Sequence, residues 1–325
     1  MTMSKIVVVG SINIDIVNYV DRLPTPGETI HSRNTQFNPG GKGANQAVAA
    51  VRSGGDVFMI GAVGNDTFGQ PIMEGLHAYG IRVDHISVEP GHTGMANITV
   101  DDLGENVIVL TGGANHSIRS AKVTEALRTL NDVGVLLCQN EIPWEVTRHT
   151  IFEANQRGIR VILNPAPARE VPDEVLCKID TIVLNETEAT TITGVTVGSA
   201  ADAKRAGRIL LERGVGKAIF TLGNQGSLHI HKDECTYTPA FKVNVIDSTA
   251  GGDTFIGAYA LESMTGVGER GALLFATAAA AIAVSRPGAL DSIPRRAEVI
   301  AFLENHCNEI EQVVTYERVS TQGKT

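Results

Sequence analysis

Short apolar runs alternate along the chain with longer stretches of helical character. The runs cover residues 6–10, 57–60, 133–137, 161–164, 181–185 and 217–221. Continuous apolar runs of this length are typical of parallel strands that are buried on both faces. Helices are predicted between them, over 43–53, 68–79, 120–130, 144–157, 200–213 and from 254 onward, with Ser117 and Ser199 as candidate caps. The alternation predicts an α/β fold with an open, mostly parallel sheet.

Two stretches interrupt this alternation. Residues 15–38 are rich in turn-forming residues, and residues 92–111 form a hairpin-like pattern of two extended segments around a polar turn. The two insertions could pair into a small sheet that closes over a binding site as a lid. The alternative is a surface flap without a function.

The most informative segment is 247–253, which reads Asp-Ser-Thr-Ala-Gly-Gly-Asp before an apolar helical run. Small residues leave backbone N–H groups uncovered, and a helix start adds unpaired donors and the positive end of a dipole. Together they predict a pocket for a phosphate group. The carboxylate of Asp253 would repel an anion, but it suits a base that takes the proton from a hydroxyl attacking phosphorus. The segment therefore suggests a kinase.

Polar residues near the amino terminus could bind a sugar. Asn13 and Asp15 alternate after the first strand, so in an extended chain they point to the same side and could hold vicinal hydroxyls. The alternative is an Asx turn that ends the strand. Residues 38–46 are rich in glycine and contain Lys42 and Asn45, but their spacing is not that of a Walker phosphate loop. The alternative here is a glycine turn before a core helix.

Further candidates follow later strands. Glu141 could accept a hydrogen bond from a sugar hydroxyl. Asn185 and Glu188 lie one helical turn apart, which suits Mg²⁺ and its waters beside phosphates, or else a helix cap. Residues 221–226 could contact a nucleotide through their backbone. A dehydrogenase is disfavoured, because the Gly-x-Gly-x-x-Gly fingerprint is missing after the first strand.

Composition narrows the class of protein. The chain has 325 residues, of which 43% are hydrophobic, and its net charge of -9 argues against DNA or RNA as a partner. The four cysteines form no Cys-x-x-Cys pair, and no secretory signal is recognised. The apolar stretch 271–285 is shorter than the roughly 20 residues of a membrane span. We expect a cytoplasmic protein without a membrane partner, with a single domain over 1–319 and a flexible tail over 320–325.

The segments 40–47, 164–169, 185–188 and 247–253 together resemble the PfkB family of carbohydrate kinases and, within it, the ribokinases. The resemblance covers about residues 5–303. It implies a ribokinase-like three-layer α/β/α sandwich with a mostly parallel central sheet and a small β-sheet lid. It also implies ATP-dependent phosphorylation of the terminal hydroxyl of a pentose, with D-ribose as the first candidate. Deoxyribose, fructose or a nucleoside remain alternative substrates, and a non-enzymatic sugar or nucleotide sensor is a further alternative.

The resemblance also implies roles for individual residues. Asp253 would be the base, and the N–H groups of Ala250, Gly251 and Gly252 would form the anion hole. Together with Asp253, the sugar would be held by Ser11, Ile12, Asn13, Asp15, Gly40, Gly41, Lys42, Gly43, Asn45 and Glu141. ATP would contact Asn185, Thr221, Leu222, Gly223, Asn224, Gln225, Gly226, Gly252 and Thr277. Glu188 would organise Mg²⁺ through water, and K⁺ would be bound by Asp247, Thr249, Ala283, Arg286, Gly288 and Ser292.

The resemblance further implies a homodimer that forms through the lid. One departure concerns the anion hole. It reads Ala-Gly-Gly-Asp, where ribokinases often have Ala-Ala-Gly-Asp. We expect Gly251 to loosen this loop without removing a hydrogen-bond donor.

Overall fold

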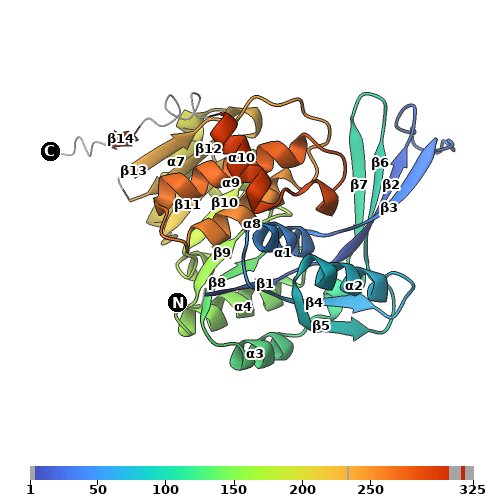
Figure 1. Ribbon diagram of the computed structural model, residues 1–325, viewed down its shortest axis with the longest axis horizontal. Coiled ribbons are helices and arrows are strands. Elements are labelled where there is room, and N and C mark those ends of the chain that lie inside the picture. Colours follow the sequence, from blue (N-terminus) through green and yellow to red (C-terminus); the bar gives the residue numbers. More distant parts are fainter. Residues whose placement is uncertain (1–3, 233, 307–315, 319–325) are drawn as a thin grey trace.

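A sheet of ten strands forms the centre of the computed structural model, which describes residues 4–232, 234–306 and 316–318 (Figure 1). Its order is β14-β13-β12-β11-β10-β9-β8-β1-β4-β5. The parallel part contains β1 (Lys5–Val9), β4 (Val57–Gly64), β5 (Arg82–Glu89), β8 (Val133–Cys138), β9 (Arg160–Leu163), β10 (Thr181–Leu184) and β11 (Lys217–Thr221). The antiparallel part contains β12 (Ser227–His231), β13 (Glu234–Thr238) and β14 (Tyr316–Arg318).

Alternating side chains of the parallel strands enter two separate cores. Ile6 and Val8 belong to one core, and Val7 and Val9 belong to the other. The first core is covered by α1 (Lys42–Arg52), α2 (Gly69–Tyr79), α8 (Gly251–Glu262), α9 (Gly268–Val284) and α10 (Arg296–Asn305). The second is covered by α3 (Ser120–Thr129), α4 (Trp144–Gln156), α5 (Asp173–Leu176), α6 (Glu186–Thr193) and α7 (Ala200–Glu212). The predicted three-layer α/β/α sandwich is confirmed, because the parallel strands β1, β4 and β8–β11 bury apolar side chains on both faces.

A second sheet of four strands stands beside this body, in the order β3-β2-β6-β7 (Figure 1). It consists of β2 (Asn13–Tyr19), β3 (Asn34–Gly40), β6 (Gly94–Val100) and β7 (Asn106–Thr111). β2 pairs in parallel with β6, so the two predicted insertions do combine into one small sheet. Since β2 begins shortly after β1 ends, the small sheet is attached at the carboxyl edge of the central sheet.

The local predictions are mostly confirmed. Each of the six predicted strands is present, whereas β5 and β12–β14 were not predicted because their runs are short or partly polar. Ser199 caps α7 by accepting a hydrogen bond from the N–H of Asp202 at 3.2 Å. Ser117 as a cap was wrong, because α3 begins after Arg119 without a side-chain cap. The predicted tail 320–325 lies outside the described residues.

The apolar stretch 271–285 is a buried helix, as predicted, and forms most of α9. None of the helices in the described ranges combines the length and the apolar character that crossing a bilayer requires.

The chain order places a crevice beside β1. After β1 the chain builds β4 and β5 on one side, and later β8 and its neighbours on the other. Ligands of open α/β sheets bind beyond the carboxyl ends of the strands at such a switch point. The polar residues that follow β1, β8, β9, β10 and β11 all meet at this edge.

Candidate active site

Asp253 lies in the first turn of α8, and its orientation is set by the first turns of α1. The side chain is 8% exposed. Its Oδ2 accepts a hydrogen bond from Nδ2 of Asn45 at 2.9 Å, and its Oδ1 accepts one from Nε2 of Gln46 at 3.0 Å. Because each oxygen has a fixed amide donor, the carboxylate has one preferred orientation. The structure thus brings together Asn45 and Asp253, two predicted site residues from opposite ends of the chain.

A chain of buried amides supports this arrangement. Nε2 of Gln139 donates to Oε1 of Gln46 at 2.6 Å, and Nε2 of Gln46 also lies 3.3 Å from Oδ1 of Asn164. Asn164 in turn donates to the backbone carbonyl of Val183 at 3.1 Å. Gln46 and Gln139 were not predicted as site residues. The one signal for Gln46 is its position as an amide within an alanine-rich helix.

A cavity of about 230 Å³ opens in front of Asp253. The predicted site residues that line it are Lys42, Asn185, Glu188, Thr221, Ala250, Gly252 and Asp253. They come from α1, the carboxyl edges of β10 and β11, and the start of α8. The structure therefore collects the predicted base, anion-hole, magnesium and nucleotide residues around one space.

The start of α8 offers backbone donors to this cavity. Ala250 precedes the helix with a left-handed conformation (φ 57°), which turns the chain sharply into α8. The N–H of Gly251 donates to the carbonyl of Ser248 at 3.3 Å, whereas those of Ala250 and Gly252 find no partner among the described residues. A Cβ placed on Gly252 would meet no atom within 4 Å. Together these features describe an open site for an anion at a helix start.

Lys42 lines the same cavity. It forms no ion pair within 4.0 Å in the described part of the chain. Burial acts to lower the pKa of Lys42, but the carboxylates of Asp253, Glu141, Glu188 and Asp15 outweigh it and raise the pKa. Lys42 therefore stays protonated and carries an unpaired charge beside the anion site. The predicted contact of Lys42 with the sugar stays a prediction.

Asn13 is buried and held by a residue that was not predicted. Its Oδ1 accepts a hydrogen bond from Nδ2 of Asn115 at 2.8 Å. Oδ1 of Asn115 accepts from the N–H of Ile12 at 2.9 Å, and its Nδ2 donates to the carbonyl of Ile12 at 3.1 Å. With its oxygen occupied, Asn13 keeps its amide N–H₂ as the group that can donate to a ligand.

Asp15 lies on the same side of β2 and is 7% exposed. Its carboxylate accepts no hydrogen bond from another described residue. Burial raises the pKa of Asp15 to about 7, the negative charges of Glu141 and Asp253 act in the same direction, and Lys42 opposes them. A buried carboxylate without donors has a high cost, and this makes it a candidate acceptor for ligand hydroxyls.

The glycines at the start of α1 allow these groups to approach closely. A Cβ on Gly40 would lie 2.1 Å from Oδ2 of Asp15, and one on Gly43 would lie 2.6 Å from the backbone nitrogen of Ser11. Gly41 has a φ of +91°. The predicted glycine turn before a core helix is therefore present, and it also shapes the polar pocket.

Glu141, which follows β8, contacts the loop after β1 and the start of α1. Its Oε2 accepts hydrogen bonds from Oγ of Ser11 at 2.6 Å and from the N–H of Lys42 at 3.2 Å. The carboxylate therefore caps the start of α1 from a distant segment.

Asn185 and Glu188 form a complete capping box at the start of α6. The N–H of Glu188 donates to Oδ1 of Asn185 at 2.9 Å, and the N–H of Asn185 donates to Oε2 of Glu188 at 2.9 Å. The alternative that we kept for this pair, a helix cap, is thus present. Glu188 also lines the cavity, and burial raises its pKa, with Asp253 adding to the effect. Glu188 can therefore cap α6 and line the cavity at the same time.

The predicted nucleotide residues divide into two groups. Thr221 lines the cavity, and the turn after β11 contains Leu222, Asn224, Gln225 and the left-handed Gly223 (φ +53°) and Gly226 (φ +93°). Thr277 lies in the middle of α9, where its Oγ1 donates to the carbonyl of Leu273 at 2.8 Å. It is not among the residues that line the cavity.

The predicted potassium residues come from two segments that lie side by side. Oδ1 of Asp247 accepts from the N–H of Thr249 at 2.9 Å, and Oδ2 accepts from the N–H of Gly288 at 3.0 Å. The carbonyl of Ala283 accepts from the N–H of Arg286 at 3.1 Å, and buried Ser292 donates to the carbonyl of Ala289 at 2.8 Å. The carbonyl oxygens of Thr249, Arg286 and Gly288 accept no hydrogen bond in the described ranges. Such free oxygens suit a hard cation.

Gly251 has a steric explanation. A Cβ on this residue would lie 2.6 Å from Cγ1 of Val284, the last residue of α9. The carbonyl of Val284 accepts hydrogen bonds from the N–H groups of Ile246 and Asp247, so its backbone is fixed. The structure thus gives a packing reason for a glycine at this position, while the expected loosening of the loop stays a prediction.

We predict that Gly251→Ala destabilises the protein by about 1–3 kcal/mol, the usual cost of overpacking, and lowers kcat. Gly251→Ala/Val284→Ala should recover most of both losses, because the shortened side chain makes room. Urea unfolding and steady-state rates of the two single variants and the double variant measure the coupling. Effects that simply add would contradict the steric explanation.

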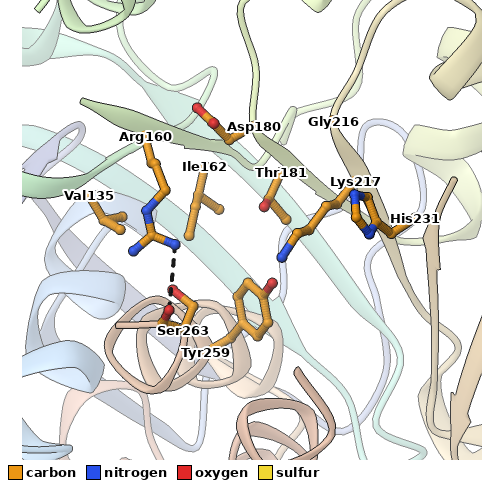
Figure 2. A pocket seen from close by; sticks show the side chains of 10 residues that line it. All are labelled: Val135, Arg160, Ile162, Asp180, Thr181, Gly216, Lys217, His231, Tyr259 and Ser263. Atoms are coloured by element: carbon orange, nitrogen blue, oxygen red, sulfur yellow. Dashed lines mark hydrogen bonds between the residues drawn. The ribbon is translucent and has the colours of Figure 1, made fainter. Parts of the chain in front are cut away.

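A second cavity, of about 200 Å³, lies at the opposite edge of the sheet. Figure 2 shows Arg160 and Lys217, the first residues of β9 and β11, reaching toward Tyr259 and Ser263 near the carboxyl end of α8. Arg160 donates to the carbonyl of Ser263 at 3.4 Å, and Lys217 pairs with Glu269 at 2.5 Å. None of the predicted site residues lines this cavity, and its cations are already engaged in the structure, so it is not the candidate active site.

Comparison with known proteins finds carbohydrate kinases over most of the chain. The pattern of the pfkB family carbohydrate kinases matches residues 3–296. The chain is 40% identical to the ribokinase of Haemophilus influenzae over 92% of this chain and 98% of that protein. It is 34% identical to a deoxyribokinase of Salmonella typhi over 89% and 95% of the two chains.

The chain is also similar to a solved structure and to a longer, bifunctional protein. The structure of Arabidopsis thaliana ribokinase complexed with ribose and ATP has a TM-score of 0.86 and 32% identity, over 93% of this chain and 99% of that one. The chain is also 38% identical to a bifunctional ribokinase/ribose-5-phosphate isomerase A of Fructilactobacillus sanfranciscensis and spans 56% of that protein's length.

Proposed function

The chain belongs to the pfkB family of carbohydrate kinases, and from this premise we propose that it transfers the γ-phosphoryl group of ATP to the terminal hydroxyl of D-ribose. The observation that carries the proposal is the position of Asp253. Its carboxylate is oriented by Asn45 and Gln46 and lies beside the open N–H groups at the start of α8. A base next to an anion site is the arrangement that phosphorylation of a hydroxyl requires.

The proposed mechanism assigns a step to each group. Asn13 donates to a ribose hydroxyl, while Asp15 and Glu141 accept from hydroxyls and so fix the position of the sugar. Asp253 takes the proton from the terminal hydroxyl as that oxygen attacks the γ-phosphorus, and ADP leaves as the bond between the γ-phosphorus and its bridging oxygen breaks. The backbone of Gly252 and the charge of Lys42 stabilise the negative charge on the transferred group. Positioning and charge stabilisation supply most of the rate enhancement in such a transfer.

Two cations complete the proposal. Mg²⁺ neutralises phosphate charge when it is bound, and Glu188 would hold it through water. No three His, Cys, Asp or Glu side chains group into a metal site in the part of the chain that the structure describes. Phosphate oxygens and water would therefore supply most of its ligands. K⁺ would bind beside the anion hole between the free carbonyls of Thr249, Arg286 and Gly288.

The substrate has close competitors. One relative is a deoxyribokinase, so deoxyribose is the second candidate, followed by fructose and nucleosides. A sensor that binds sugar and ATP without catalysis is the alternative of another class. Asp253 with two dedicated donors favours the enzyme, because a sensor needs no oriented base.

A coupled ADP-release assay over a panel of sugars tests the proposal. We expect the highest kcat/KM with D-ribose. A higher value with deoxyribose, fructose or a nucleoside would replace the substrate and keep the reaction. Binding of ribose and ATP without release of ADP would support the sensor.

We further propose that the protein is a homodimer that forms through the small sheet. The strand β7 exposes Val107, Ile108, Val109 and Leu110, each by 46–59% of its surface. An edge strand with exposed apolar side chains is a surface that a second copy can cover. We also propose a cytoplasmic location, since the thiols of Cys138 and Cys177 form no disulfide, as is usual in a reducing compartment.

Charges on β7 should break such a dimer. We expect the wild type to elute at twice the mass of one chain, and either Val107→Glu/Val109→Glu or Ile108→Glu/Leu110→Glu to elute as a monomer, since buried unpaired charges are costly. Light scattering after gel filtration gives the masses, and Val267→Glu serves as the control, because Val267 is exposed but lies in the turn between α8 and α9. A monomeric wild type at micromolar concentration would contradict the proposal.

A further inference from the structure

Arg52, the last residue of α1, holds the loop that connects α9 and α10. Its Nη1 donates to the carbonyls of Leu290 at 3.1 Å, Asp291 at 3.4 Å and Ile293. One guanidinium group therefore collects three carbonyls of a short loop. Ser292, a predicted potassium residue, lies between two of them.

Tyr79, the last residue of α2, strengthens this contact. The guanidinium carbon of Arg52 lies 4.7 Å from the centre of the Tyr79 ring. The Tyr79 hydroxyl donates to Oδ1 of Asp291 at 2.7 Å. The loop is thus held through three backbone carbonyls and one carboxylate, by two side chains from two helices.

The other end of the loop reaches the anion hole. The N–H of Gly288 donates to Asp247, and the second carboxylate oxygen of Asp247 accepts from Thr249, just before Ala250. At its other end, α1 holds Asp253 through Asn45 and Gln46. The helix α1 therefore orients the base near its start and the loop beside the anion hole at its end.

The conformation of Arg52 leaves one of its buried nitrogen atoms unpaired, which is unfavourable. Nε of Arg52 is buried and has no hydrogen-bond partner among the described residues. An unpaired buried donor is unfavourable unless the rest of the side chain compensates for it. The three carbonyls and the aromatic ring are the contacts that do so.

We propose that Arg52 and Tyr79 are positioning residues that hold residues 288–293 in the conformation that binds the monovalent cation. They set the affinity for the cation without contacting either substrate. The inference rests on the proposed function, because it needs K⁺ to bind beside the anion hole.

The test compares Arg52→Lys and Tyr79→Phe with the wild type. Lysine keeps the charge but lacks the planar guanidinium that lies over the Tyr79 ring, and phenylalanine removes only the hydroxyl. Arg148→Lys is the matched control, because Arg148 also lies over an aromatic ring, that of Phe152 at 4.9 Å, but belongs to α4. Two readouts are measured against KCl concentration: the melting temperature, with NaCl at equal ionic strength as reference, and the rate of ADP release.

We expect the K⁺ concentration for half-maximal stabilisation and activation to rise about three- to tenfold in Arg52→Lys, and less in Tyr79→Phe. The rate at saturating K⁺ should stay near that of the wild type. Unchanged half-saturation in both variants, or a loss of melting temperature that is equal in KCl and NaCl, would overturn the positioning role. A wild type that does not respond to K⁺ would overturn the cation site and this inference, but not the kinase.

Discussion

Asp253→Asn is expected to lower kcat by roughly 10²–10⁴-fold, the usual contribution of a general base, while KM for the sugar changes little. The amide cannot accept the proton of the attacking hydroxyl. It also offers only one acceptor oxygen to the two donors, Asn45 and Gln46, that hold the carboxylate. Stopped-flow and steady-state measurements of ADP release give the rate.

The control for this variant must separate chemistry from binding. Calorimetry with the sugar and with ADP should show affinities within a few-fold of the wild type. Asn45→Ala removes one donor to the carboxylate but keeps the base, so we expect it to lose less activity than Asp253→Asn. Turnover of Asp253→Asn close to that of the wild type would remove Asp253 from the mechanism.

Asp15→Asn is expected to weaken sugar binding strongly and, at pH 8, to stabilise the folded protein. A hydrogen bond to a charged group contributes about 1.5–3 kcal/mol, so the loss of the carboxylate should raise KM at least tenfold. The stability effect follows from the pKa of Asp15, which burial raises from 3.8 to about 7.

The raised pKa of Asp15 makes the stability of the fold depend on pH. Between pH 4 and 7 the folded protein keeps a proton that the unfolded chain has lost, so stability falls as pH rises through this window. Above pH 7 the buried charge destabilises the fold by an amount on the order of 2–4 kcal/mol, which asparagine removes. Below pH 4, where the carboxyl group is protonated in both states, the substitution should change stability little.

Urea unfolding of both proteins at pH 5 and pH 8 measures this difference. Exposed Asp84 on β5 offers a matched control, because Asp84→Asn should have the same small effect at both values. The same pKa predicts that KM for the sugar in the wild type falls as pH rises through 7, since the ionised carboxylate is the better acceptor. A stability difference that is equal at pH 5 and pH 8 would contradict a raised pKa.

Much of the fold was predictable, because the signals that specify it are local. Each of the six apolar runs became a strand, and 271–285 became a buried helix. The polar β5 escaped prediction because it is an edge strand that buries only part of its surface. The inner strand β12 escaped because its short sequence alternates polar and apolar residues and so lacks a continuous apolar run. The predicted cap at Ser117 was wrong, because α3 begins only after Arg119 and a hydroxyl can cap a helix only beside its first turn.

Several residues that line the cavity could be predicted individually, but their arrangement in space could not. The segment 247–253 was recognisable from its small residues, and Asn13 and Asp15 from their spacing. That Asn45 and Asp253, 208 positions apart, share a hydrogen bond could not be predicted from spacing. Gln46, Gln139 and Asn115 were missed because an amide in a core segment has no local signal that separates support from function.

By itself, the amino-acid sequence determined the layered α/β fold, the small sheet and the residue types that the proposed chemistry needs, because periodicity and turn preferences act over a few residues. The tertiary structure decided the electrostatics and the packing of the site. It placed Asp15, Glu141 and Asp253 close enough to raise the pKa of Asp15, left the charge of Lys42 unpaired at the cavity, and set Val284 against Gly251. Charge interactions and steric exclusion depend on distance in space, and only the folded chain defines that distance.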